Sequence, residues 1–235
     1  MSASSSTVAG QRPRAHALDP RAPGLSLRQA LLIFTRATSA RIISGLLVIA
    51  LAVRIAVGGF SVWDLVVAAT IVAVHPFTEW VIHVGVLHWR PRRLGRFVLD
   101  TDLAHKHRLH HVSPHEPEYW YTPMRGALIG FAISALIIWM VSPNVELWLT
   151  FLATIFAVGL VYEWTHYLCH TSYRPRGRLY RRLWRLHRLH HFKNEHYWMG
   201  VTMHLADWVL GTLPSPRAVP TSPTCRDLLG RDGLR

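Results

Sequence analysis

A five-residue stretch, HRLHH, occurs twice in this 235-residue chain, at positions 107–111 and 187–191. Within each copy the histidines stand at positions i, i+3 and i+4, which share one face of an α-helix. A neutral imidazole is a common metal ligand. The repeat therefore predicts two helices that each present three metal-ligating histidines. These are His107, His110 and His111 in the first copy, and His187, His190 and His191 in the second.

Two pairs of histidines precede these triplets and extend the set. His166 and His170 are four residues apart, so they share a helical face. His83 and His88 are five apart, which does not align on a regular helix, and we expect the helix to end or bend near Gly85. The pairs and triplets together make ten histidines, enough to hold two metal ions.

The other six of the sixteen histidines carry weaker signals. His204 follows the second triplet closely and is either a ligand or a residue that contacts one. The remaining five fit ordinary surface or hydrogen-bonding roles, because an isolated histidine is rarely a ligand. They are His16, His75, His105, His115 and His196.

Membrane helices are the elements that must position this set. Half of the residues are hydrophobic and the mean hydropathy is +0.18, which is high for a soluble domain. Four apolar runs lie near the roughly 20 residues that a helix needs to cross a bilayer. Short segments join them in pairs, so we expect two helical hairpins, with Arg54 reaching the lipid headgroups from the first. The runs cover residues 42–60, 62–86, 126–141 and 145–167.

Charge predicts the orientation of these helices. The two short connections, 58–61 and 142–144, contain no Lys or Arg, whereas the N-terminal tail and the segments 88–125 and 174–188 are rich in arginine. The positive-inside rule then places both termini and both long segments in the cytoplasm. This arrangement accounts for most of the formal charge of +13, so we expect no nucleic-acid partner. Two cysteines predict no disulfide framework.

These observations predict an all-α integral membrane protein: four transmembrane helices in two hairpins, with a cytoplasmic helical cap rich in histidine. Residues 1–35 lack apolar periodicity and are expected to form a disordered basic tail. The membrane domain covers 36–212. Residues 213–235 are rich in proline and are expected to form a loose tail.

The composition of the set narrows the metal chemistry. Thiolates that would favour structural zinc are scarce, and of the two cysteines only Cys169, beside His170, lies within the set. Soluble di-iron bundles use a Glu-x-x-His motif from each of two helices, whereas this chain contains a single one, Glu163 to His166. A pair of iron ions that activates O2 fits a histidine-only set better, although such sites also accept zinc, which can replace iron during purification.

The order of these histidines resembles the membrane fatty acid hydroxylase/sterol desaturase superfamily, with its histidine boxes. The spacing is His-x4-His from His83, His-x2-His-His from His107, His-x3-His from His166 and His-x2-His-His from His187. The stretch HHFKNEHYWMGVTMHLADWVLGT, residues 190–212, is similar to the segment after the last box in the fatty acid 2-hydroxylase branch. The resemblance covers roughly residues 62–212.

The resemblance implies an oxygenase of the bacterial inner membrane or the endoplasmic reticulum that hydroxylates or desaturates a lipid with O2. It implies that all ten histidines bind two iron ions. A fused cytochrome b5 domain has no room in the chain, so electrons are expected from a separate donor of the cytochrome b5 or ferredoxin type.

Acidic residues near the histidines are candidates to support the ligands. Glu79 and Glu163 each lie about one turn before a histidine pair, within membrane helices where an acid is costly unless functional. Ligand histidines usually donate their second N–H to a carboxylate or a carbonyl. We therefore expect Glu79 and Glu163 to support ligands, and Asp207 to orient His204 or a ligand.

Other readings stay open at this stage. Within the superfamily, a sterol or carotenoid hydroxylase or a desaturase is possible. A histidine-rich metal transporter or buffer is a different class, but transport sites usually lie near the bilayer midplane rather than at one face. A membrane protein that uses zinc as a structural staple is the third alternative.

Overall fold

The computed structural model describes residues 18–230, and its framework is four long helices. They are α2 (Thr38–Val57), α3 (Val62–Ile82), α5 (Met124–Val141) and α6 (Val145–His170). All four are long and apolar enough to cross a membrane, which confirms the predicted spans. Helix α6 packs against α2, α3 and α5 and is the centre of the bundle.

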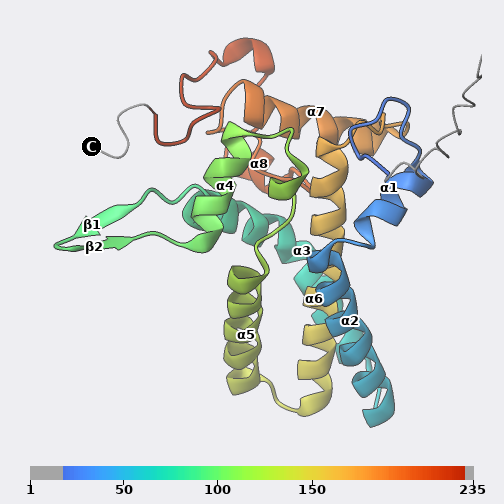
Figure 1. Cartoon of the computed structure of the whole chain (residues 1–235). Helices are drawn as coiled ribbons and strands as arrows, with labels where there is room; N and C mark the ends of the chain where they lie inside the picture. Colours follow the sequence, from blue (N-terminus) through green and yellow to red (C-terminus); the bar gives the residue numbers. More distant parts are fainter. Residues whose placement is uncertain (1–17, 231–235) are drawn as a thin grey trace, which may run out of the picture.

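Side-chain caps explain where the hairpins turn. Ser61 and Asp64 form a capping box at the start of α3, and Asn144 accepts a hydrogen bond from the backbone of Leu147 at the start of α6. Gly58 and Gly59, with φ of 68° and 65°, supply the left-handed backbone between α2 and α3. Both turns lie at the lower end of the bundle in Figure 1, whereas the histidine pairs lie at the opposite ends of α3 and α6.

The cap consists of shorter elements above the long helices, at the top of Figure 1. Helix α7 lies across the end of α6, with α4 and α8 beside it. A two-stranded antiparallel hairpin, turning at Gly95, projects from one side and is the only sheet in residues 18–230. The elements are β1 (Arg92–Leu94), β2 (Phe97–Leu99), α4 (Asp102–Val112), η2 (Pro117–Tyr119), α7 (Arg178–Phe192), α8 (Leu205–Val209) and η3 (Pro216–Ala218).

The expected N-terminal tail is too long. Within 1–35, residues 27–34 form helix α1 (Leu27–Phe34), which Ser26 caps. Ala30 and Phe34 are buried, and Tyr167 of α6 donates a hydrogen bond of 3.2 Å to the Ala30 carbonyl. The short apolar run of α1 gains enough burial against α6 to order this segment. Residues 1–17 lie outside the described residues.

The C-terminal segment also differs from a loose tail. Residues 214–230 pack over the cap, where Ser222 donates its backbone N–H to the Lys193 carbonyl at 2.7 Å. The side chain of Asn194 donates to the Pro220 carbonyl at 3.2 Å. Leu228 and Cys225 are buried. Prolines that prevent helix formation are thus compatible with an ordered loop, and only 231–235 lie outside the described residues.

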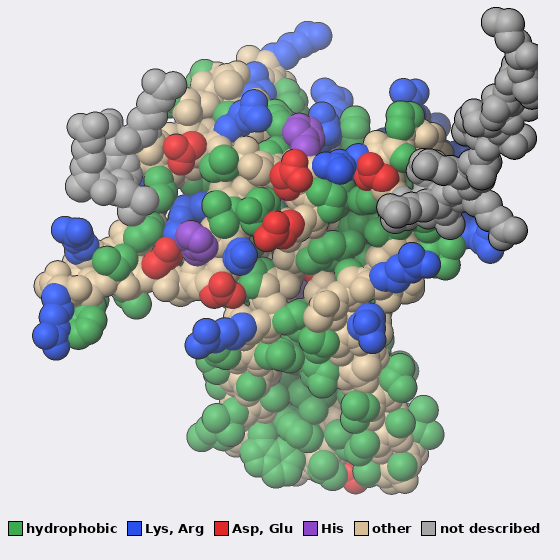
Figure 2. Space-filling model, viewed as in Figure 1, with side chains coloured by type: hydrophobic (Ala, Val, Ile, Leu, Met, Phe, Trp, Pro, Cys, Tyr) green, Lys and Arg blue, Asp and Glu red, His purple; other side chains and the backbone are tan. Residues whose placement is uncertain are grey.

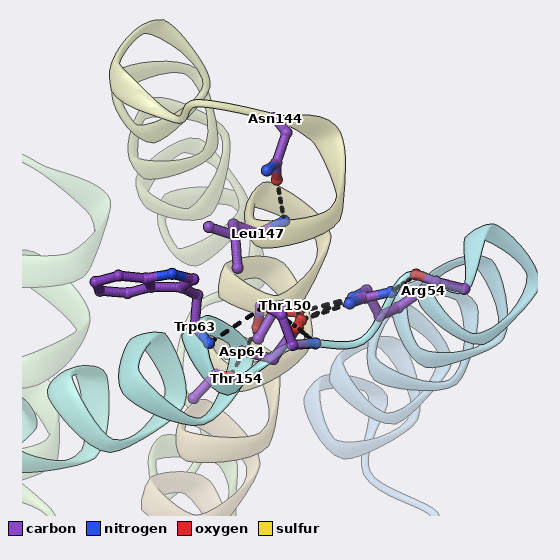
Figure 3. Close-up of polar contacts among 9 residues, drawn as sticks. Arg54, Trp63, Asp64, Asn144, Leu147, Thr150 and Thr154 are labelled. Carbon is purple, nitrogen blue, oxygen red and sulfur yellow. Dashed lines mark hydrogen bonds and ion pairs between the residues drawn. The ribbon is translucent and has the colours of Figure 1, made fainter.

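Arg54 does not reach the headgroups as expected. Its guanidinium is buried and paired with Asp64 of α3 at 2.5 Å and with the Thr150 hydroxyl of α6 at 2.9 Å. Figure 3 shows these side chains converging from three helices near the hairpin turns. The pairing satisfies a charge that would otherwise be costly in lipid. It joins α2, α3 and α6 at the end of the bundle opposite the histidines.

Candidate metal centre

The ten predicted histidines come together beneath α7 as two groups of five. Within each group the candidate ligand atoms all lie within 4.8 Å of one another. The groups are adjacent, because the rings of His111 and His191 are 4.3 Å apart. Group I is His83, His88, His107, His111 and His190, and group II is His110, His166, His170, His187 and His191. His204 belongs to neither group.

The two HRLHH helices divide their histidines in a crossed pattern. On α4, the first and last histidines of the triplet face group I while His110 faces group II. On α7 the first and last face group II while His190 faces group I. Positions i and i+4 point nearly the same way on a helix, and i+3 points to the side. Each half of the chain therefore contributes four candidate ligands to one group and one candidate ligand to the other.

A π-helical turn brings His83 and His88, which are five residues apart, onto the same side of the helix. The regular α-helix ends at Ile82, and the chain continues as the π-helical turn η1 (His83–Leu87), which is the change of helix geometry at the position expected near Gly85. The backbone N–H of His88 donates to the His83 carbonyl at 3.0 Å, an i to i+5 hydrogen bond. Residues five apart align on such a turn, and π-turns of this kind are frequent at functional sites. His83 and His88 consequently reach the same group.

Backbone carbonyls orient half of the rings. Each of five histidines donates its Nδ1–H to a carbonyl oxygen, which leaves Nε2 unprotonated and aimed into its group. The pairs are His83 with Met199 at 2.6 Å, His111 with Cys225 at 2.9 Å, His166 with Trp120 at 2.9 Å, His170 with Pro114 at 3.1 Å and His190 with Tyr197 at 2.9 Å.

This arrangement of lone pairs fits a bound metal ion. The Nε2 atoms of His111 and His190 are 3.2 Å apart, yet both rings already donate from Nδ1. Neither Nε2 carries a proton in that state, so the two lone pairs repel unless a cation lies between them. An all-imidazole set suits iron, zinc, copper or nickel. The chemistry of the donors therefore matches a transition metal in each group.

Burial keeps the cap histidines neutral. It lowers the pKa of His111 to about 3, and it holds the pKa values of His107, His110 and His190 well below their usual range. Repulsion from neighbouring imidazoles adds to this effect in the same three residues. Neutral imidazole is the form that binds a metal ion. The groups are therefore competent ligands at neutral pH without losing a proton first.

Contrary to expectation, the predicted carboxylates do not contact the histidine rings of the two groups but hydrogen-bond to the segments whose carbonyls orient those rings. Glu79 accepts hydrogen bonds from the backbone of Val201 and from the backbone and hydroxyl of Thr202. Asp207 accepts from the backbone of Met199 and Gly200, both at 2.8 Å. Together they hold the segment 198–204, which supplies the Met199 carbonyl for His83.

Glu163 plays the corresponding part for group II. It accepts from the Thr122 backbone at 3.0 Å and from the Thr122 hydroxyl at 2.6 Å. This fixes the segment that supplies the Trp120 carbonyl for His166. None of the three carboxylates hydrogen-bonds a histidine of either group within the described residues. His204 is buried with Nε2 unpaired, and Asp207 does not bond to it.

The five carbonyl oxygens that accept from the histidine rings are the functional groups that sequence reasoning missed. Every residue has a carbonyl, so no residue type marks the five that matter. The structure marks one of these carbonyls by its backbone conformation. Trp198, beside Met199, has a φ of 57°, which is unusual for a bulky residue. The segment that carries Met199 thus adopts a demanding backbone conformation, which Asp207 and Glu79 secure.

An apolar groove leads from the membrane helices to the histidines. Its volume is about 610 Å³, and its walls are α3, α5 and α6. At one end it is lined by His107 of group I and by His110 and His166 of group II. It follows α6 down to Phe151, fifteen residues away, or about 22 Å at 1.5 Å per residue. A leaflet of hydrocarbon is about 15 Å deep, so one lipid chain fits along it.

Polar side chains gather at the histidine end of the groove. Lys106 and Tyr119 line it beside His107, and the Lys106 ammonium lies 5.8 Å from the Tyr119 ring centre. Figure 2 shows the matching division of the outer surface, with hydrophobic side chains covering the long helices and Lys and Arg gathered on the cap. The groove thus joins a lipid-facing region to a polar mouth.

A family model for fatty acid hydroxylases matches residues 67–212. Comparisons with curated proteins and with solved structures found no match. The matched range contains all ten histidines, both triplets and the carboxylates that support their carbonyl partners. Because the match covers more than half of the chain, the protein belongs to the fatty acid hydroxylase family, within the membrane fatty acid hydroxylase/sterol desaturase superfamily.

Proposed function

We propose that this protein is a di-iron oxygenase that hydroxylates an acyl chain of a membrane lipid with O2, using electrons from a separate protein donor. The observation that carries the proposal is the groove, which is mostly apolar, extends about 22 Å along α6 and ends at candidate ligands of both groups. Membership of the fatty acid hydroxylase family supports an oxidoreductase of this type. The reaction consumes one C–H bond, one O2, two electrons and two protons, and yields one alcohol and one water.

The residues of the chain bind and orient the substrate in this proposal. A lipid chain enters sideways between α3 and α5, which both pack on α6, and lies along the groove. Lys106 at the mouth faces the polar end of the lipid, where its long apolar stem can lie along the chain. Contact between Lys106 and the polar end would place a carbon near that end of the lipid beside His107 and His110.

The histidines supply the metal site and its dry surroundings. Two iron ions, when bound, would supply the activation of O2. The rings of His110, His111, His190 and His191 are almost completely buried, which keeps water from the reacting carbon. The distribution of arginine supports a cytoplasmic position for this end of the bundle. A soluble donor could then reach it in a bacterial cytoplasm or beside the endoplasmic reticulum.

Lipid mass spectrometry of expressing cells tests the proposal. Cells with the wild-type protein should accumulate a lipid heavier by one oxygen, and ¹⁸O2 should label it. His107→Ala and His187→Ala remove one ligand from each group and should each abolish the product. His115→Ala and His196→Ala are matched controls on exposed histidines and should leave the product intact. Product that persists in both ligand variants would show that the groups do not perform this reaction.

Two alternatives have distinct outcomes in the same experiment. A hydroxylated or desaturated sterol or carotenoid would keep the reaction type and change the substrate class. Cellular metal uptake that follows expression, with no oxidised lipid, would favour a transporter or buffer. The histidines lie at one end of the long helices rather than near their middle, which disfavours transport.

A further inference from the structure

The outward face of α7 carries a concentration of positive charge. The segment 171–193 contains seven arginines and no acidic residue. Arg181, Arg185 and Arg188 are all exposed, and their spacing of four and three places them on one face of the helix. None of them forms an ion pair within residues 18–230, where the arginines that do are Arg21, Arg54 and Arg108.

The opposite face of the same helix carries ligands of both groups. His187, His190 and His191 are buried on it. An α-helix with its side chains is about 10–12 Å wide. Only one helix therefore separates the arginine face from the metal ligands, and no other described element of the cap presents histidines on one side and unpaired arginines on the other.

Aromatic rings lie among these arginines. The Arg188 guanidinium stacks 5.0 Å from the ring centre of Trp184 and 5.1 Å from that of Phe192. The guanidinium of Arg226, in the C-terminal segment, also lies 5.8 Å from the Phe192 ring centre. Trp184, Leu189 and Phe192 line a shallow depression between the arginines. Arginine and large aromatic residues are enriched in the centres of protein–protein interfaces.

The rings also connect this surface to the ligands. The Phe192 ring is 6.3 Å from the ring of His191, a member of group II. Phe192 thus contacts arginines that face solvent and a histidine that faces the metal position. A redox partner that docks on Trp184 and Phe192 comes within about one helix width of both groups.

A membrane surface is the other anionic candidate, and the geometry disfavours it. Helix α7 lies beyond the end of α6, because the Nε2 atoms of His170 and His187 are 2.8 Å apart. Figure 1 shows α7 across the top of the cap, on the side away from the long apolar helices. Its arginines consequently face water. The exposed hairpin β1–β2, with Arg92, Arg93 and Arg96 beside Phe97 and Val98, lies nearer the level of the membrane helices and serves as the control surface.

We propose that the arginine face of α7 is the docking site for an acidic one-electron carrier protein. The inference rests on the proposed hydroxylase function and names its partner surface. In each encounter the carrier would be oxidised and would pass one electron to iron held by the two histidine groups. Two encounters supply the two electrons of one hydroxylation, and water supplies the two protons. Charge complementarity speeds such encounters and makes them sensitive to salt.

Binding to two acidic probes tests this site directly. The protein, in discs of neutral phosphatidylcholine, is titrated with an oxidised plant-type [2Fe–2S] ferredoxin and with the soluble haem domain of cytochrome b5. The wild type should bind at least one of them, with an affinity that falls as salt rises from 20 to about 200 mM. Arg181→Glu/Arg185→Glu/Arg188→Glu should weaken binding at low salt by at least tenfold. Arg92→Glu/Arg93→Glu/Arg96→Glu makes the same charge change on the hairpin and should bind like the wild type.

Turnover with two electron sources separates docking from catalysis. With the carrier and its reductase, the α7 variant should lose at least tenfold in product formation. With reduced methyl viologen, a small carrier that needs no docking surface, its rate should stay within twofold of the wild type. Metal content near that of the wild type shows that the cap is folded, and the milder triple Arg→Gln variant repeats the measurement if the glutamate variant fails to fold.

Several outcomes would overturn the proposal. They are wild-type binding to neither probe, binding that does not change with salt concentration, and equal losses of binding in the hairpin control. A deficit that appears only when the measurements are repeated in discs containing anionic phosphatidylglycerol would overturn it as well. The last outcome would assign the arginines to a lipid surface. Failure of the wild type to form product even with methyl viologen would count against the hydroxylase function, and the binding data would still decide the docking site.

Discussion

Asp207→Asn tests how the carbonyl supports hold the metal centre. Both oxygens of this carboxylate accept backbone N–H groups: Oδ1 from Met199 and Oδ2 from Gly200, each at 2.8 Å. An amide has one oxygen and one NH2. Whichever way the asparagine turns, its NH2 therefore faces a backbone N–H that is itself a donor.

The magnitude follows from the burial of this site. Asp207 has no exposed surface, so the displaced N–H finds no water. An unsatisfied buried donor costs about 1–3 kcal/mol, and the loss of charge weakens the remaining hydrogen bonds as well. We expect a loss of about 2–4 kcal/mol in the free energy of unfolding. The Met199 carbonyl then shifts from His83, and loss of such support typically weakens metal binding 10–100-fold, here at group I alone.

Glu163→Gln is the matched control on the other half. Only Oε1 accepts a backbone N–H, from Thr122, whereas Oε2 accepts the Thr122 hydroxyl, which can rotate and accept from an amide instead. The glutamine can thus satisfy both partners. We expect a loss below about 1.5 kcal/mol and little change in metal binding at group II.

Metal analysis after dialysis against a competing chelator measures both effects. Asp207→Asn should fall from about two metal ions per chain to about one, and Glu163→Gln should keep about two. Adding His107→Ala to Asp207→Asn should remove nothing further, because both lesions affect group I, whereas adding His110→Ala should remove the second ion. Equal losses in the two single variants, or a double variant with His107→Ala that loses both ions, would refute the reasoning.

Four further outcomes are expected. Burial lowers the pKa of His111 to about 3, so the unfolded chain binds a proton at higher pH than the folded chain does. Thermal melts of the metal-free protein should therefore show a free energy of unfolding that is constant above about pH 6.5 and decreases below it. The decrease should be at most about 1.4 kcal/mol per pH unit for each such histidine. Gly200→Ala would place a Cβ 2.1 Å from the Met203 carbonyl oxygen and should destabilise by about 1–3 kcal/mol, as chemical unfolding would show. Gly130→Leu meets no atom within 4 Å at its Cβ but fills the groove, so chain-length competition should shift the product toward shorter acyl chains without loss of expression. Asp64→Ala leaves the buried Arg54 charge unpaired and should cost about 3–5 kcal/mol, with the metal content of the remaining folded protein unchanged.

Local patterns were enough to predict the framework and the candidate ligands. Apolar runs of bilayer length predicted four helices, since hydrophobic length is a property of contiguous residues. The HRLHH repeat predicted three histidines on one helical face, because the positions i, i+3 and i+4 are neighbours on any α-helix. Helix α1 was missed, since its eight residues are too few to form a stable helix alone and depend on packing against α6.

Tertiary structure decided how the histidines are shared. The sequence alone determined that ten histidines gather at one end of two hairpins, because helix periodicity and the membrane restrict where they can lie. Which group each ring joins depends on how α4 and α7 cross, and that crossing gives each half of the chain four ligands in one group and one in the other. The π-turn at His83 and the carbonyls of Met199 and Cys225 likewise depend on distant segments meeting. No residue type encodes a backbone carbonyl, so only the folded chain could select the ones that orient the metal ligands.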